Sequence, residues 1–391
     1  MDPSHRTPVF DPLPTMDFID LRTQYEHIRD DVRRRVDAVL AHGRFVNGPE
    51  IPELESRLAA VCGTRYCVCC ASGTDALLMA LMAQGVGPGD AVFTPAFSFV
   101  AAAEVTALLG ATPVFVDIGP ATFLMDPTSL EHAMDTVARV RGRKRLRPAA
   151  VIPVDLFGLP ADYKALGAVA ARRRAAVIAD AAQAFGASRA GGMAGALAPV
   201  SVTSFYPAKP LGAYGEGGAV FCQTSRMAET LRSIREHGMG AHRYEHVRLG
   251  LNARMHTLQA AVLLAKLGVF EEEVARRQDV ARRYRLGLAG VVETPVVPDG
   301  CTSVWAQYTI QSDRRDAIAA ALARQGIPTA IHYPKALHLQ PAFSGLRLRR
   351  GAFPNAERAS RRVLSLPMHP YLRSEEQRRV IDAVKAAVGK K

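Results

Sequence analysis

One lysine of this 391-residue chain stands in backbone that leaves its amine little freedom. Lys209 lies between Pro207 and Pro210, whose rings fix the φ angle on either side of it. Glycines follow at positions 212, 215, 217 and 218, and we expect them to adopt positive φ angles in a tight loop. A restricted amine suits chemistry in which it meets a carbonyl group repeatedly in one geometry, as a Schiff-base lysine does. A solvated lysine in a surface turn is the alternative.

An acidic residue, Asp180, ends an apolar run that begins at Ala175. A carboxylate at the end of a buried strand is costly unless a positive or hydrogen-bonding group meets it. A protonated pyridine nitrogen would meet that need, because a neighbouring carboxylate keeps such a ring able to accept electrons. Gln183 could donate a hydrogen bond to a phenolic oxygen of the same ring. The alternative for Asp180 is the N-cap of a following helix.

A third polar stretch, Ser72 to Asp75, follows a short apolar strand and opens an apolar helix, Ala76 to Met82. Free N–H groups at a helix N-terminus, together with the positive end of the helix dipole, bind phosphate. In isolation the stretch is more typical of an ordinary N-cap than of a phosphate site. Taken with Lys209 and Asp180, it predicts a site for pyridoxal phosphate.

The elements that must position these residues alternate along the chain. Helical patterns are expected over residues 18–40 and 51–61, and the expected strands are 67–71, 91–95, 114–117, 149–154, 175–180, 200–205 and 219–222. Continuous apolar strands between helices predict an α/β fold with a mostly parallel sheet that is buried on both faces. Ligands of such sheets bind beyond the strand ends, where Ser72, Asp180 and Lys209 fall.

Length and pattern predict three parts: a flexible leader over residues 1–15, a cofactor-binding large domain over 16–270 and a small α+β domain over 271–391. The small domain is expected to contain a strand over 304–310 and helices over 315–325 and 374–388. No run approaches the roughly 18 apolar residues of a membrane span, and no signal pattern opens the chain. We therefore expect a cytoplasmic protein without a membrane partner.

Cysteines and basic residues are the remaining candidates for chemistry. Cys67, Cys69 and Cys70 cluster, but no second ligand group at zinc spacing accompanies them, so buried strand residues are favoured and no metal is expected. The net charge is +12, and the arginine-rich run 139–147 has no aromatic residue for base stacking. A solvated loop is therefore favoured over a nucleic-acid contact. A positive field also favours an anionic substrate such as a nucleotide sugar.

Three motifs stand in order: Ser72-Gly-Thr-Asp-Ala-Leu77, Asp180-Ala-Ala-Gln183 and Ser204-Phe-Tyr-Pro-Ala-Lys209. Together they resemble the DegT/DnrJ/EryC1/StrS family of sugar aminotransferases, which have the fold of aspartate aminotransferase (fold type I). The resemblance runs from about Phe18 to the C-terminus. It also includes residues 48–50, 250–254, 332–334 and 364–371.

The resemblance implies a role for each matching position. Lys209 matches the lysine that forms the Schiff base and later moves the proton, Asp180 the partner of the pyridinium nitrogen, and Gln183 a residue near the ring oxygen. Phe99 matches an aromatic residue that stacks on the ring. The phosphate cup is matched by Gly73, Thr74, Asp75 and Ser204.

Other matching positions imply a shared site. Asn252 matches an asparagine that reaches the phosphate from the other subunit, so the resemblance implies a homodimer with shared active sites. Residues that contact the nucleotide sugar in the family are matched by Arg254, His332 and Tyr333.

The implied reaction is transfer of an amino group from L-glutamate to a keto-sugar nucleotide, with pyridoxamine phosphate as the intermediate cofactor form. Residues 209–218, 302–308 and 328–334 resemble in particular the members that aminate C3 of UDP-2-acetamido-2-deoxy-3-oxo-D-glucuronate for bacterial surface polysaccharides such as the lipopolysaccharide O-antigen. Arg254 could then pair with the C6 carboxylate.

Four alternatives remain beside this one. They are a dTDP- or UDP-keto-sugar 3- or 4-aminotransferase of another pathway, a sugar dehydratase of the same family, a regulatory protein and a dinucleotide-binding oxidoreductase. Lys209 argues against the dehydratases, which have histidine in its place. A strand after the glycines argues against the oxidoreductase, whose fingerprint requires a helix there.

Overall fold

The computed structural model describes residues 16–140, 142 and 145–389. The predicted leader, residues 1–15, lies outside these ranges, as do three residues of the arginine-rich run. The larger part of the described chain contains helices α1 (Leu21–His42), α2 (Glu50–Cys62), α3 (Gly73–Ala83), α4 (Ala101–Leu108), α5 (Pro127–Arg139), α6 (Tyr163–Arg172), α7 (Ser225–Arg235), α8 (Thr257–Leu267) and α9 (Phe270–Leu288). Its main strands are β1 (Tyr66–Cys70), β2 (Asp90–Pro95), β3 (Thr112–Val116), β4 (Arg147–Val151), β5 (Ala176–Asp180), β8 (Val200–Ser204) and β9 (Gly218–Cys222).

These seven strands form one sheet in the order β1-β9-β8-β5-β4-β2-β3. The pairs from β8 to β3 are parallel, whereas β9 runs antiparallel to both β8 and β1. The predicted α/β fold with a mostly parallel sheet is therefore confirmed. A small sheet of β10 (Cys301–Thr302), β6 (Ser188–Arg189) and β7 (Gly192–Met193) lies outside it.

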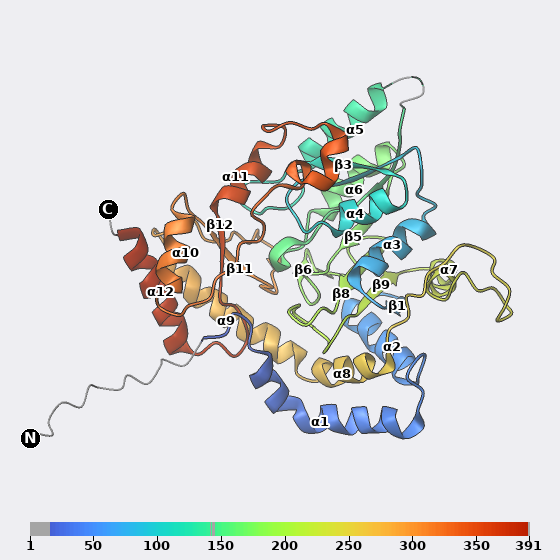
Figure 1. Cartoon of the computed structure of the whole chain (residues 1–391), viewed down its shortest axis with the longest axis horizontal. Helices are drawn as coiled ribbons and strands as arrows, with labels where there is room; N and C mark the ends of the chain where they lie inside the picture. Colours follow the sequence, from blue (N-terminus) through green and yellow to red (C-terminus); the bar gives the residue numbers. More distant parts are fainter. Residues whose placement is uncertain (1–15, 141, 143–144, 390–391) are drawn as a thin grey trace, which may run out of the picture.

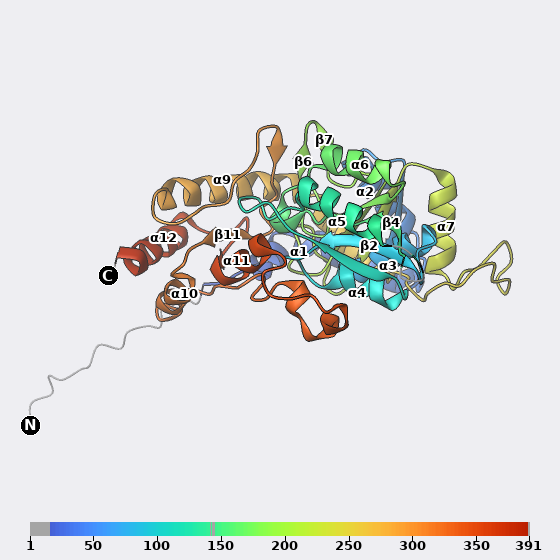
Figure 2. The same cartoon turned by 90° about the horizontal axis from the view of Figure 1, so that it is seen from above.

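Helices cover both faces of the sheet, as the apolar strands require. Helices α3, α4 and α7 pack on one face, and α2, α5, α6 and α8 pack on the other. Viewed from above, α5 and α6 lie on one side of the strands and α3 and α4 on the other (Figure 2). Strands β8 and β9 are buried at every position. The cysteines of β1 are buried too, as the sequence predicted.

The C-terminal part has its own apolar core. It contains α10 (Arg315–Ala323), α11 (Pro354–Arg362), α12 (Ser374–Gly389) and the antiparallel pair β11 (Tyr308–Gln311) and β12 (Val363–Leu366). Helices α9, α10 and α12 pack against this pair, around the touching rings of Tyr284 and Tyr308. They lie together on the left of Figure 1. The predicted domain boundary at residue 270 falls on the first residue of α9, and the division stays a prediction.

Two predicted segments were wrong in detail. The strand expected over 304–310 begins only at Tyr308, because Trp305 adopts a left-handed φ of 52° and Val304 N–H bonds to the Gly158 carbonyl. The arginine-rich run is not all loop either. Arg139 ends α5, and Arg147 opens β4 with a bidentate pair to Asp90. No helix within the described ranges is long and apolar enough to cross a membrane.

Candidate active site

Four neighbouring strands, β5, β8, β9 and β1, bring the predicted site residues to one end of the sheet. Asp180 is the last residue of β5 and Ser204 the last of β8, which lie side by side. Gly218 opens β9 and is paired with both Ser204 and Cys70, the last residue of β1. The turn into α3 and the loop that carries Lys209 therefore leave the sheet at neighbouring points.

Residues Ser72 to Asp75, at the N-terminus of α3, form a cradle that Ser204 approaches closely, and this segment is called the α3 cradle. Ser72 Oγ accepts a hydrogen bond from Asp75 N–H at 3.0 Å and donates to Asp75 Oδ2 at 2.8 Å, so the N-cap interpretation is correct. A Cβ atom on Gly73 would lie 2.6 Å from Ser204 Cβ. Within the described chain, the N–H groups of Gly73 and Thr74 have no protein partner. These two groups and the helix dipole can bind an anion there.

The glycines after Lys209 serve close packing instead of unusual φ angles. None of glycines 212, 215, 217 and 218 has a positive φ angle, so that expectation was wrong. A Cβ atom on Gly218 would lie 2.3 Å from the Ser72 carbonyl oxygen, and one on Gly212 would lie 2.4 Å from that of Pro207. A side chain at Gly218 would push the start of β9 away from the α3 cradle, and one at Gly212 would distort the Lys209 loop itself.

Lys209 and Asp180 interact electrostatically. Burial lowers the pKa of Lys209, while the negative charges of Asp180 and Glu216 raise it. Burial raises the pKa of Asp180, while the hydrogen bond from Ala182 N–H, at 3.1 Å, and the charge of Lys209 lower it. Residues 182–186 form turns, so the helix N-cap alternative for Asp180 is wrong. The structure thus brings an amine and a carboxylate together in a poorly solvated place.

A loop from the C-terminal part reaches the same place. Tyr333 Oη accepts a hydrogen bond from Gln183 Nε2 at 3.3 Å, and the Tyr333 ring lies 6.2 Å from that of Phe99. Burial and the charge of Asp180 raise the pKa of Tyr333 to about 12. His332 Nδ1 lies 3.1 Å from Ser365 Oγ, and burial and the charge of Lys209 lower the pKa of His332. His332 therefore interacts electrostatically with Lys209, and Tyr333 interacts electrostatically with Asp180.

Asn252 and Arg254 occupy a different environment. Arg254 Nη2 donates to Asn252 Oδ1, and the Asn252 side chain is exposed. The intervening Ala253 carbonyl accepts from Ala71 N–H at 2.9 Å, one residue before the α3 cradle. The backbone between Asn252 and Arg254 is thus bonded to the residue that precedes the α3 cradle. Among the described residues, no hydrogen bond joins either side chain to Lys209, Asp180 or Gln183.

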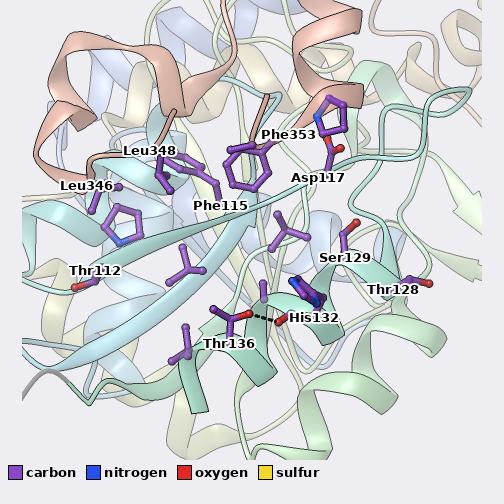
Figure 3. A pocket seen from close by; sticks show the side chains of 17 residues that line it. Thr112, Phe115, Asp117, Thr128, Ser129, His132, Thr136, Leu346, Leu348 and Phe353 are labelled. Atoms are coloured by element: carbon purple, nitrogen blue, oxygen red, sulfur yellow. Dashed lines mark hydrogen bonds between the residues drawn. The ribbon is translucent and has the colours of Figure 1, made fainter. Parts of the chain in front are cut away.

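An apolar cavity of about 710 Å³ lies elsewhere, at the open edge of the sheet. Figure 3 shows Phe115 of β3 and Phe353 on one side of it and His132 and Ser129 of α5 on the other. None of the residues that line this cavity belongs to the predicted site.

Two residues near the site were missed by the sequence analysis. The negative charge of Glu216 raises the pKa of Lys209. Asp155 follows the predicted strand 149–154 and bonds through its backbone N–H to the Asp180 carbonyl at 2.9 Å. Its position directly after an apolar strand, like that of Asp180, was the available signal.

The residues gathered here fit pyridoxal phosphate. The α3 cradle is suited to a phosphate, Asp180 to a protonated ring nitrogen and Lys209 to an aldehyde carbon. The cradle would be filled by a Cβ atom at Gly73 or Gly218, so space for the ligand depends on these glycines.

Comparisons with known proteins agree with this chemistry. The DegT/DnrJ/EryC1/StrS aminotransferase family matches residues 26–385. UDP-2-acetamido-2-deoxy-3-oxo-D-glucuronate aminotransferase of Pseudomonas aeruginosa is 48% identical over 358 residues, which are 91% of this chain and 96% of that protein.

Two solved structures show the same fold. A DegT DnrJ EryC1 StrS aminotransferase from Brucella abortus has a TM-score of 0.93 and 47% identity, with 96% of this chain and all of that chain covered. NtdA from Bacillus subtilis, with bound pyridoxamine phosphate, has a TM-score of 0.85 and 28% identity. The match covers 99% of this chain and 87% of NtdA.

Fold and site together define an aminotransferase of fold type I with pyridoxal phosphate as its cofactor. The chain belongs to the DegT/DnrJ/EryC1/StrS aminotransferase family.

Proposed function

We propose that this enzyme moves an amino group from L-glutamate to C3 of UDP-2-acetamido-2-deoxy-3-oxo-D-glucuronate, in the cytoplasm, for a bacterial surface polysaccharide such as the O-antigen of lipopolysaccharide. The observation that carries the proposal is the likeness, over 91% of this chain, to a relative named for this reaction. The amine and carboxylate beside an anion cradle support the same chemistry.

Each residue of the site has a proposed task. When bound, pyridoxal phosphate supplies an aldehyde and an electron-accepting ring. Lys209 Nζ would hold the aldehyde carbon and would later carry the proton, which its lowered pKa favours because a neutral amine can accept one. Asp180 holds the ring nitrogen protonated, and Gln183 donates to the ring oxygen. Phe99 stacks on the ring, and the phosphate is held by Gly73, Thr74, Asp75 and Ser204.

A homodimer with shared sites is part of the proposal. The loop between α7 and α8 projects from the body of the protein (Figure 1) and exposes Tyr244, Val247 and Leu249, with 83%, 55% and 88% of their surfaces accessible. Apolar side chains this exposed favour contact with another copy of the chain. Asn252 lies at the end of this loop and is exposed, so it can reach a phosphate in the partner subunit.

The substrate residues come from two elements. His332 and Tyr333 lie beside Lys209 and Asp180, where a sugar would enter. Arg254 gives the planar pair of donors that a C6 carboxylate requires. The net charge of +12 also favours an anionic nucleotide sugar.

Two nucleotide sugars that differ only at C6 test the proposal. Purified enzyme is incubated with ¹⁵N-glutamate and either the 3-oxo-glucuronate or its 3-oxo-glucose counterpart, and the masses of the products are measured by mass spectrometry. We expect ¹⁵N in the product and a preference for the glucuronate that Arg254→Gln reduces about tenfold or more. A product that has lost water without gaining nitrogen would support a dehydratase, and equal rates with both sugars would support an aminotransferase of another pathway.

A further inference from the structure

A second buried carboxyl group lies beside Asp180. Asp155 N–H donates to the Asp180 carbonyl at 2.9 Å, and Asp180 N–H donates to the Pro153 carbonyl, also at 2.9 Å. The backbone of residues 153–155 thus continues β4 alongside the end of β5. The Asp155 side chain is completely buried. Two carboxyl groups therefore share the poorly solvated end of adjacent strands.

Only one of the two carboxyl oxygens of Asp155 has hydrogen-bond partners among the described residues. Its Oδ1 accepts from Ala161 N–H and from Tyr163 Oη–H, both at 2.7 Å. Its Oδ2 is buried and has no hydrogen-bond partner among the described residues. A carboxylate carries charge on both oxygens, so a bare buried oxygen is expensive in the ionised form. A proton on Oδ2 removes that charge and leaves one unpaired neutral O–H group, which costs less than an unpaired carboxylate oxygen, while Oδ1 keeps both of the hydrogen bonds that it accepts.

The surrounding charges favour the same form. The titratable and charged groups that influence Asp155 are Asp180 on β5, Tyr163 on α6 and Arg189 on β6. Burial and the like charge of Asp180 raise the pKa of Asp155 to about 7, against the opposing effect of its two hydrogen bonds and of Arg189. Arg189 is itself bonded to Asp162 at 2.7 Å, so it offers Asp155 only partial compensation.

Asp155 also fixes the turn that orients Gln183. Its two hydrogen bonds at Oδ1 close the segment from residue 155 to residue 163. Within that segment, Phe157 N–H donates to Gln183 Oε1 at 2.7 Å, which leaves Gln183 Nε2 free to face Tyr333. One buried side chain is thus connected to both Asp180 and Gln183.

We propose that Asp155 is a positioning residue that is protonated at about pH 6, so that Asp180 then provides the single negative charge for the ring nitrogen while Asp155 Oδ1 holds the turn that orients Gln183. This inference relies on the proposed roles of Asp180 and Gln183. The chemistry at Asp155 itself can be measured without the sugar reaction.

The direct test is infrared spectroscopy of the full-length protein with and without pyridoxal phosphate. We expect the C=O stretch of a protonated carboxyl at about pH 6, its loss by about pH 8, and its absence from Asp155→Asn. Asp117→Asn is the matched control, because Asp117 is also buried but both of its oxygens accept backbone N–H groups, from Asn355 and Ala356. The control should keep the band. A band unchanged in Asp155→Asn would overturn the proposal.

Folding and the cofactor spectrum give two further readouts. An amide reproduces the bonds of the acid, so Asp155→Asn should fold and keep Gln183 in place, whereas a variant that fails to fold would contradict the protonated state. In the loaded enzyme, the visible absorbance of the cofactor should show a step near pH 7 that Asp155→Asn removes, because ionised Asp155 would add a second negative charge near the ring. Identical pH profiles for the two proteins would refute this electrostatic effect. Either result leaves the sugar assay of the preceding section unaffected.

Discussion

Replacing Gly73 by alanine should weaken cofactor binding selectively. The added Cβ atom would lie 2.6 Å from Ser204 Cβ and 3.2 Å from Ser204 Cα. Ordinary carbon contacts need about 3.5–4.0 Å, so Ser204 or the start of α3 must move by roughly 1 Å. Both lie in the cradle proposed for the phosphate. Overpacking of this kind costs about 1–3 kcal/mol. If the cradle takes up the displacement, the Kd for pyridoxal phosphate rises about five- to 150-fold.

Titration of cofactor-free protein with pyridoxal phosphate, followed by absorbance, measures this effect. Gly167→Ala is the control, because Gly167 lies within α6 and an added Cβ atom would have no neighbour within 4 Å. That variant should gain about 0.5–1 kcal/mol of stability and keep the wild-type Kd. A folded Gly73→Ala protein with an unchanged Kd would show that the phosphate is bound elsewhere.

Two further predictions concern stability. Arg235→Met removes the guanidinium that lies 2.9 Å from buried Glu55, so the free energy of unfolding in urea should fall by about 3–5 kcal/mol. The double variant with Glu55→Gln should recover part of this loss, because it no longer leaves an unpaired buried charge. A double variant that shows the full loss would contradict the pairing. Burial lowers the pKa of His369 to about 4, so between about pH 6.5 and 4 the unfolded chain binds the proton more readily. The free energy of unfolding should therefore be highest above about pH 6.5 and fall by up to about 1.4 kcal/mol per pH unit on acidification. His369→Gln should reduce this dependence on pH. The same dependence in that variant would show that His369 is not its source.

Local signals predicted most of the strands of the main sheet. Ser72 caps α3 as its residue type indicates, and each apolar run before a polar residue became a strand of the main sheet. Helix α5 was not predicted, although Asp126 and Pro127 supply its N-cap and first position. The antiparallel direction of β9 was not readable either, because a fully buried strand has the same apolar pattern in both directions.

The site was predictable where residues lie at strand ends and was not where distant segments meet. Asp180 and Lys209 follow apolar runs, so their approach could be inferred from the sheet alone. The contact between Gln183 and Tyr333 joins residues 150 positions apart and depends on the packing of the C-terminal part. The exposed position of Asn252 has no local signal, because its proposed partner is another subunit.

Chemical trapping tests the central claim, that Lys209 binds the cofactor aldehyde. The loaded enzyme is reduced with borohydride and digested, and its peptides are sequenced by mass spectrometry. We predict a phosphopyridoxyl group on Lys209, and its loss from Lys209→Ala. The most informative competitor is Lys266, another buried amine, whose pKa burial lowers to about 8. Label on Lys266, or on any lysine other than Lys209, would contradict the account.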